Sequence, residues 1–151
     1  MSKLNIRLFF SLLCALALSF SLSAQTDLTG YWEGEITQFE GGYRSNYAFE
    51  LLLTQKGDKI EGRSYVYVDN IFSVMKVEGK VLSDGLVLTL EDTEMVDSKV
   101  LNGMEWCIKS YYLVFKKDGE TWRLDGSWMG KTSFTTCVPG KVFLKKIIPR
   151  A

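Results

Sequence analysis

The chain has 151 residues and a formal net charge of zero, because 18 Lys and Arg residues balance 18 Asp and Glu residues. That balance implies no strongly basic face, so we expect no binding to nucleic acid or to anionic membranes. Apolar residues make up 46% of the chain, which excludes an intrinsically disordered protein.

Residues 1–24 have the order of a secretory signal peptide. Lys3 and Arg7 precede an apolar run from Leu8 to about Phe20, and small residues follow up to Ala24. The run is too short for a membrane anchor, which needs roughly 20 apolar residues. We therefore expect cleavage after Ala24, no membrane span after cleavage, and a secreted or periplasmic protein that consists of residues 25–151.

Residues 25–151 are predicted to form one all-β domain. The sequence has two prolines, Pro139 and Pro149, and no Gly/Ser-rich linker divides this part. Short runs of aromatic and β-branched residues lie between turn residues, which is typical of an antiparallel meander. We expect about eight strands, over approximately residues 30–39, 46–56, 59–69, 71–82, 86–96, 106–117, 120–129 and 139–148.

Three dipeptides between apolar runs predict two-residue hairpin turns: Gly57-Asp58, Asp84-Gly85 and Asp118-Gly119. Such turns fix which residues face each other on the paired strands. The expected partners are Leu53 with Gly62, Leu51 with Ser64, Phe49 with Val66, Val81 with Leu88, Phe115 with Trp122 and Leu113 with Leu124. In this register the hairpins keep an apolar face, and a slip by one residue would turn that face outward.

A short pattern of an apolar residue, an acidic residue and a glycine recurs in the predicted strands. Its glycines are Gly34, Gly62, Gly79 and Gly126. Glycine within a strand permits a sharp bend or a close approach of two backbones, although chance repetition of common strand residues is the alternative. We expect the bends to curl the sheet into an antiparallel up-and-down barrel of about eight strands, with the first strand paired with the last.

The tetrapeptide Thr29-Gly30-Tyr31-Trp32, at the start of the first strand, resembles the Gly-x-Trp start of the calycin superfamily of lipocalins, fatty-acid-binding proteins and avidins. The layout of tight hairpins without a C-terminal helix is more similar to the avidins. The resemblance implies a barrel closed at one end, where Trp32 packs beneath the last strand against a basic side chain, for which Lys145 is the candidate. Avidins have Asn where this chain has Gly34, so biotin binding is not implied.

Cys107 and Cys137 are the two cysteines of residues 25–151. An oxidising compartment favours a disulfide between them, and two separate buried thiols are the alternative. The bridge would tie the long segment 97–105, which precedes Cys107, to the loop that contains Cys137. We expect these loops to form a rim at one end of the barrel, because loops on a rigid scaffold often carry recognition.

Aromatic residues make up 13% of the chain. Most are expected to pack in the core, and some to line an apolar pocket at an open end of the barrel. By strand alternation, Trp128 is the first choice for a pocket-lining residue, with Tyr111 and Phe49 next. We therefore expect a non-catalytic exported binding module that holds a small apolar ligand or contacts another exported protein.

Two other functions stay open at the level of sequence. A small secreted, disulfide-bridged barrel is similar in architecture to bacterial metalloprotease inhibitors, so an enzyme inhibitor or a structural accessory, acting through residues 25–27 or a loop, is one alternative. A carboxylate-dependent enzyme is the other, and it requires two close acidic side chains in a pocket. We expect no catalytic residue, metal or other cofactor, because histidine is absent and the acidic run 91–97 lacks the spacing of a calcium loop.

Overall fold

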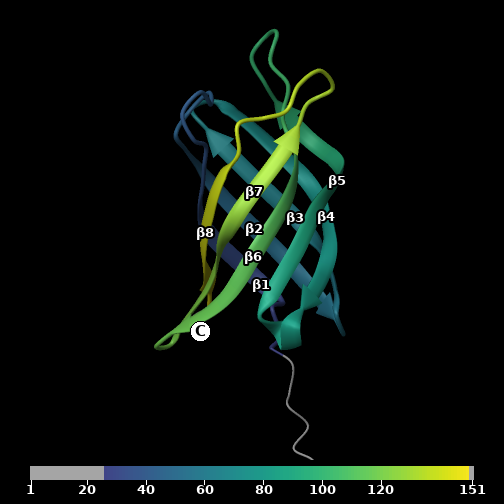
Figure 1. Cartoon of the computed structure of the whole chain (residues 1–151), viewed down its shortest axis with the longest axis vertical. Coiled ribbons are helices and arrows are strands. Elements are labelled where there is room, and N and C mark those ends of the chain that lie inside the picture. Colours follow the sequence, from purple (N-terminus) through teal and green to yellow (C-terminus); the bar gives the residue numbers. More distant parts are fainter. Residues whose placement is uncertain (1–25, 150–151) are drawn as a thin grey trace, which may run out of the picture.

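The structure is a computed structural model that describes residues 26–149, and the predicted signal peptide, residues 1–24, lies outside this range. Eight antiparallel strands form a closed barrel in which each strand pairs with the next in sequence and β1 pairs with β8 (Figure 1). The strands are β1 Gly30–Thr37, β2 Asn46–Lys56, β3 Lys59–Val68, β4 Ile71–Leu82, β5 Val87–Lys99, β6 Ile108–Asp118, β7 Thr121–Lys131 and β8 Gly140–Ile147. The predicted all-β up-and-down barrel is confirmed.

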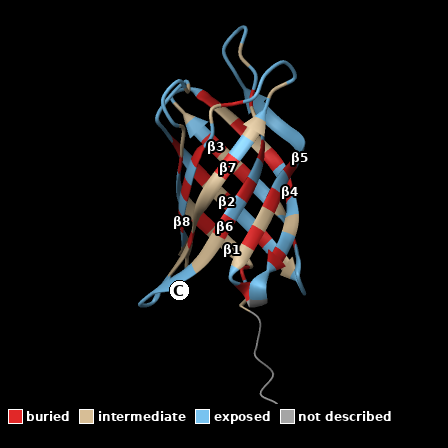
Figure 2. Ribbon diagram, in the orientation of Figure 1, coloured by how far each residue is buried: buried red, intermediate tan, exposed pale blue. Residues whose placement is uncertain are grey.

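Alternation of apolar and polar residues explains why these segments are strands. In β2, Tyr47, Phe49, Leu51 and Leu53 are all buried. The residues between them point outward and are exposed or half-buried. Because successive side chains of a strand point to opposite faces, one side of the sheet fills the barrel interior, and Figure 2 shows the resulting alternation of buried and exposed positions along the strands.

The recurring glycines lie where two backbones approach closely. A Cβ atom on Gly79 would overlap the main-chain oxygen of Thr89 on β5, and one on Gly126 would overlap that of Tyr112 on β6. Gly34 and Gly62 meet carbonyl oxygens of their neighbouring strands in the same way. The four positions therefore need glycine for the close approach expected where a sheet curls tightly.

The turn between β2 and β3 is Gly57-Asp58 as predicted, and Leu53 faces Gly62. Between β4 and β5 the predicted two-residue turn is wrong in form. A short 3₁₀ helix, η1 (Ser83–Gly85), makes the connection, with Ser83 at a φ of 52°. The strands end at Leu82 and resume at Val87, so the predicted pairing of Val81 with Leu88 is nevertheless present.

The predicted register between β6 and β7 is wrong by two residues. The turn is Gly119-Glu120 instead of Asp118-Gly119, so Phe115 faces Leu124 and not Trp122. Gly119 has a φ of 59° and occupies the first central position of the turn, where a type II′ hairpin requires glycine. A shift of two residues leaves every side chain on its predicted face, which is why the apolar pattern could not detect it.

The barrel has two different ends. The upper end, at the top of Figure 1, carries the loops 38–45, 100–107 and 132–139, and the lower end carries the turns after β2, β4 and β6. The N-terminal residues 26–29 lie at the lower end between β2 and β8, because Leu28 N–H bonds to Gln55 and Asp27 O accepts a hydrogen bond from Lys146 Nζ. Leu28 is fully buried and helps to close the lower end.

Trp32 is fully buried at the lower end, and its indole N–H donates to Leu28 O over 3.0 Å. The basic side chain that lies against it is Lys146, with Nζ 5.6 Å from the ring centre, and not Lys145 as the resemblance suggested. Trp32 faces Lys146 across the β1–β8 pair, so these two side chains share a face. Lys145 points outward to Glu33, whose carboxylate is 3.4 Å from its Nζ.

Candidate functional site

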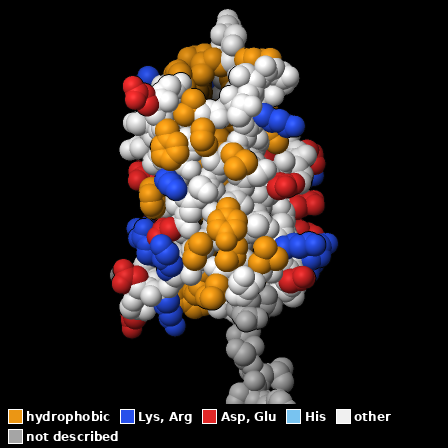
Figure 3. All heavy atoms as spheres, in the orientation of Figure 1, with side chains coloured by type: hydrophobic (Ala, Val, Ile, Leu, Met, Phe, Trp, Pro, Cys, Tyr) orange, Lys and Arg blue, Asp and Glu red, His pale blue; other side chains and the backbone are white. Residues whose placement is uncertain are grey.

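The upper end contains a pocket of about 100 Å³ that opens between the loops. Its wall is mainly apolar and aromatic, and its polar side chains include Gln38, Glu105 and Lys109. The main apolar contributors are Ile36, Val66, Ile71, Met104, Trp106 and Trp128. Figure 3 shows apolar side chains on the surface at this end, and others along the face below it. A concave, mostly apolar pocket with a few convergent polar groups is the usual form of a small-ligand site.

The predicted disulfide is present and joins two of the loops around the pocket. Cys107 and Cys137 have Cα atoms 6.3 Å apart and lie 30 residues apart in the sequence. Cys107 itself lines the pocket. The third loop is held in place because Gln38 Nε2 donates to Val138 O over 3.1 Å. The rim of the pocket is therefore cross-linked on both sides of the loop 132–139.

Lys109 projects its ammonium group into this apolar surrounding. The alternation of β6 places it on the inward face with Tyr111 and Leu113, and it is only 4% exposed. Its Nζ donates to Cys107 O over 2.9 Å and lies 5.8 Å from the ring centre of Trp106 and 5.9 Å from that of Trp128. An ammonium group has three N–H donors, so a hydrogen bond to Cys107 leaves donors for a ligand.

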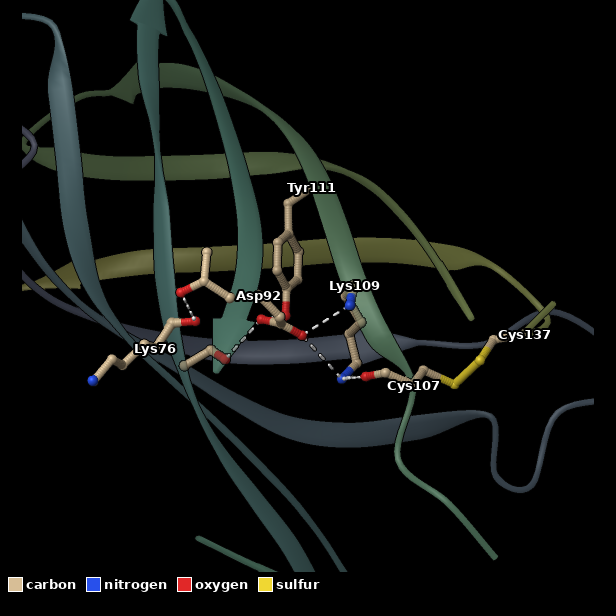
Figure 4. Close-up of polar contacts among 8 residues, drawn as sticks. Lys76, Asp92, Cys107, Lys109, Tyr111 and Cys137 are labelled. Carbon is tan, nitrogen blue, oxygen red and sulfur yellow. Dashed lines mark hydrogen bonds and ion pairs between the residues drawn. A yellow bond between two sulfur atoms is a disulfide. The ribbon is translucent and has the colours of Figure 1, made fainter. Parts of the chain in front are cut away.

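Asp92 is the counter-ion of Lys109 and lies at the point where β5 and β6 separate. The ladder between these strands joins residues 87–91 to residues 110–114. At the next position the carboxylate of Asp92 replaces a main-chain acceptor, because the main-chain N–H of Lys109 donates to Asp92 Oδ2 over 2.9 Å. Ser64 and Tyr111 hydroxyls donate to Oδ1 over 3.3 and 3.2 Å, and Lys109 Nζ is 3.8 Å from Oδ2 (Figure 4).

Burial acts on both charges of this pair. It lowers the pKa of Lys109, against the attraction of Asp92, and it raises the pKa of Asp92, against the attraction of Lys109 and the hydrogen bonds that the carboxylate accepts. Burial also raises the pKa of Tyr111 well above its usual value. A low-dielectric interior disfavours every charged form, so transfer of the proton from Lys109 to Asp92 costs less here than between exposed side chains.

Comparisons of the chain with protein-family models, with curated proteins and with solved structures found no match. The barrel is compatible with a calycin-like fold. The chemistry of the site is therefore interpreted from its geometry. Among residues 26–149, no group of three or more His, Cys, Asp or Glu side chains is placed to hold a metal ion, and no helix is long and apolar enough to cross a bilayer.

Three residues were predicted from the sequence to line the pocket, and the structure places one of them, Trp128, in the pocket wall and the other two elsewhere in the barrel. Trp128 lines the pocket, and its indole N–H donates to Thr37 O over 2.7 Å. Tyr111 and Phe49 lie deeper in the barrel, where their rings stack with centres 5.6 Å apart. Tyr111 contributes to the site through its hydrogen bond to Asp92 rather than as part of the pocket wall.

Sequence reasoning missed Asp92 and Lys109. A signal for both was present, because strand alternation places Lys109 on the face of Tyr111 and Leu113, and Asp92 on the face of Leu90. A charged residue in the inward phase of a strand on each of two neighbouring strands indicates a buried pair, since isolated buried charges are too costly. Asp92 lies within the acidic run 91–97, most of which is exposed, so the composition of the run conceals the inward position of this one residue.

Proposed function

We propose that this chain is an exported, non-catalytic barrel that binds a small, largely apolar ligand in the pocket at the upper end. The observation that carries the proposal is the buried ammonium group of Lys109 in an otherwise apolar, aromatic wall. Glu105 accepts hydrogen bonds from Ser133, and Gln38 accepts one from Tyr47. By contrast, the ammonium group of Lys109 donates to Cys107 O and faces Asp92, which leaves one of its three N–H groups for a ligand. The ligand is therefore expected to bring a hydrogen-bond acceptor to Lys109.

The volume of the pocket limits the size of the ligand. A dry engineered cavity of roughly 150 Å³ binds benzene, and this pocket has about 100 Å³. A short alkyl chain or part of one ring fits inside, with the remainder of the ligand between the loops. Export is supported by the predicted signal peptide and by the disulfide between Cys107 and Cys137, because disulfides persist in oxidising compartments.

The four tryptophans allow a direct test by NMR. Trp106 and Trp128 line the pocket, whereas Trp32 and Trp122 lie at the lower end. The hydroxyl of benzyl alcohol can accept a hydrogen bond from Lys109. In a titration with this ligand, we expect the indole N–H signals of Trp106 and Trp128 to shift and those of the two lower-end tryptophans to keep their positions. Equal shifts of all four, or none, would contradict binding in this pocket.

A pair of variants provides the control for this titration. Ile71→Phe enlarges a side chain of the pocket wall and should abolish the shifts by filling the pocket. Thr54→Phe makes a similar change at an exposed position near the lower end and should leave them unchanged. Native mass spectrometry of protein purified from its source then identifies any ligand that copurifies.

Contact with another exported protein is a second candidate, favoured by aromatic side chains that are exposed at the upper end. Phe39 is 52% exposed and Phe134 is 71% exposed, and both lie in loops of that end. Exposed apolar patches often mark protein interfaces. The double variant Phe39→Ser/Phe134→Ser should keep the benzyl alcohol shifts and lose a partner that the wild-type protein retains from the exported fraction of its source. Retention of the partner by the variant would contradict this role.

A further inference from the structure

Lys109 differs from an ordinary surface lysine in a way that concerns the chemistry of its amine. It is buried at the inner side of a pocket that opens to solvent, so small molecules can reach it while bulk water is largely excluded. Its partner Asp92 is 3.8 Å away and is fixed by the hydroxyl groups of Ser64 and Tyr111. A primary amine is a nucleophile only when it is neutral, and desolvation in an apolar pocket is a known way to make it so.

We propose that Lys109 captures small aldehydes that enter the pocket by forming a reversible imine. This inference rests on the proposed function, since it requires that the pocket admits ligands. It names the class of ligand as an aldehyde with a short apolar substituent, because the pocket wall beside the amine is aromatic and aliphatic. The aldehyde oxygen can also accept a hydrogen bond from an N–H of the Lys109 ammonium group.

The reaction is balanced by groups that the site already contains. The ammonium group of Lys109 passes one proton to Asp92, and the neutral nitrogen attacks the aldehyde carbon to give a carbinolamine. The nitrogen–carbon bond forms as the carbonyl π bond breaks. Transfer of one N–H proton to the former carbonyl oxygen completes the neutral carbinolamine. The protonated Asp92 then returns its proton as the carbinolamine hydroxyl leaves as water, and the nitrogen keeps its last proton, so the product is a protonated imine. No oxidant or reductant takes part, and the positive charge of the protonated imine faces the ionised carboxylate of Asp92.

The charged and titratable groups around the amine agree with this role. Asp92, which accepts a hydrogen bond from Tyr111, faces it from the barrel interior, and Glu105, Tyr43 and Tyr47 are the other titratable groups of the pocket wall. Burial lowers the pKa of Lys109 and raises that of Asp92, which favours the neutral pair needed for attack. The exposed Lys59 instead pairs with the exposed Glu61 at 4.0 Å.

The test uses the wild-type protein, butanal and sodium cyanoborohydride, which reduces an imine to a stable amine. Peptide mapping by mass spectrometry gives the rate of butyl addition at each lysine near neutral pH. We expect Lys109 to react first, roughly tenfold or more faster than the exposed Lys59 and Lys141, and benzyl alcohol to slow Lys109 alone. Reaction at Lys109 no faster than at the exposed lysines would overturn the proposal.

Two variants separate imine chemistry from simple binding. Lys109→Arg keeps a cation and cannot form an imine, so the fast site should disappear. Asp92→Asn lowers the pKa of Lys109 further by removing the attraction of the carboxylate, but it also removes the acid that protonates the carbinolamine hydroxyl. Imine formation at position 109 should therefore become slower although more of the amine is neutral, while Glu61→Gln should leave the rate unchanged. If benzyl alcohol shifts the signals of Trp106 and Trp128 but butanal does not label Lys109, the imine proposal fails and the binding function stands. If neither occurs, both fail.

Discussion

Each end of the barrel holds a lysine ammonium group between two tryptophan rings, but the two groups differ in their contact with water. At the lower end, Lys146 Nζ lies 5.6 Å from the ring centre of Trp32 and 4.6 Å from that of Trp122. It donates to Asp27 O over 3.1 Å and is only half-buried. Solvent can therefore hydrate the charge, and the cluster is stable without a buried carboxylate.

At the upper end, Lys109 has the same kinds of neighbour, with Trp106 and Trp128 on its sides and Cys107 O as its acceptor. Its side chain is 4% exposed, and that of its partner Asp92 is 0% exposed. The comparison teaches that aromatic rings and a carbonyl oxygen are sufficient for a cation that keeps part of its hydration. A cation removed from water needs a counter-ion as well, and the pair that results is the reactive feature of the pocket.

The largest difference between the ends is expected from removal of the buried cation. Lys109→Met leaves Asp92 buried without its counter-ion and should lower the free energy of unfolding by about 3–5 kcal/mol, measured by urea denaturation. The double variant Lys109→Met/Asp92→Asn should regain most of this loss, because a neutral amide remains to accept the main-chain N–H of position 109. Equal stabilities of the single and double variants would contradict a buried charged pair.

The disulfide lies at the upper end of the barrel, between two of its loops. The double variant Cys107→Ser/Cys137→Ser should lower the free energy of unfolding by about 3–4 kcal/mol, because a closed loop of this length restricts the unfolded chain. Local effects should be confined to one end, with changed indole signals for Trp106 and Trp128. Changes of the same size for Trp32 and Trp122 would show that the ends are not independent.

A smaller effect is expected at the lower end. Lys146→Met should lower the free energy of unfolding by only about 0.5–1 kcal/mol, the usual contribution of a cation above aromatic rings at an exposed site. Comparison with Lys109→Met in the same denaturant series tests the argument directly. A loss of the same size at both ends would mean that burial does not set the difference.

The smallest effect concerns the carboxylates and has opposite signs at the two ends. Hydrogen bonds from Thr29 lower the pKa of Asp27, so its contribution is present above pH 3.8 and is lost as the pH falls through its folded pKa. Burial raises the pKa of Asp92 in the folded protein above its ordinary value of 3.8. Between pH 3.8 and the raised pKa, the folded state therefore binds more protons than the unfolded state, and the protein loses stability as the pH rises through this interval.

Measurement of unfolding free energy between about pH 3 and 7 tests these signs. The advantage of the wild-type protein over Asp27→Asn should shrink on acidification. For Asp92 the clean comparison is Lys109→Met against Lys109→Met/Asp92→Asn, which keeps Lys109 from titrating. In this pair the single variant should gain relative stability on acidification, and a loss would contradict the raised pKa of Asp92.

Local patterns in the sequence determined the strands and the closure of the barrel. Alternation from Asn46 to Lys56 and from Ile71 to Leu82 predicted β2 and β4 with the bounds that the structure shows. The inward phase of glycines such as Gly79 predicted the close backbone approach. These features depend on side-chain direction and backbone sterics over a few neighbouring residues, which a single sequence contains.

The tertiary structure decided what depends on residues far apart in the chain. Whether Lys145 or Lys146 meets Trp32 is set by the pairing of the first and last strands, and the two-residue shift after Asp118 leaves the apolar faces unchanged. The link between Asp92 and Lys109 arises because β5 leaves β6 at that position, so a side chain replaces the missing ladder partner. Alternation states which face a residue occupies, but only the closed barrel determines which residue it meets there.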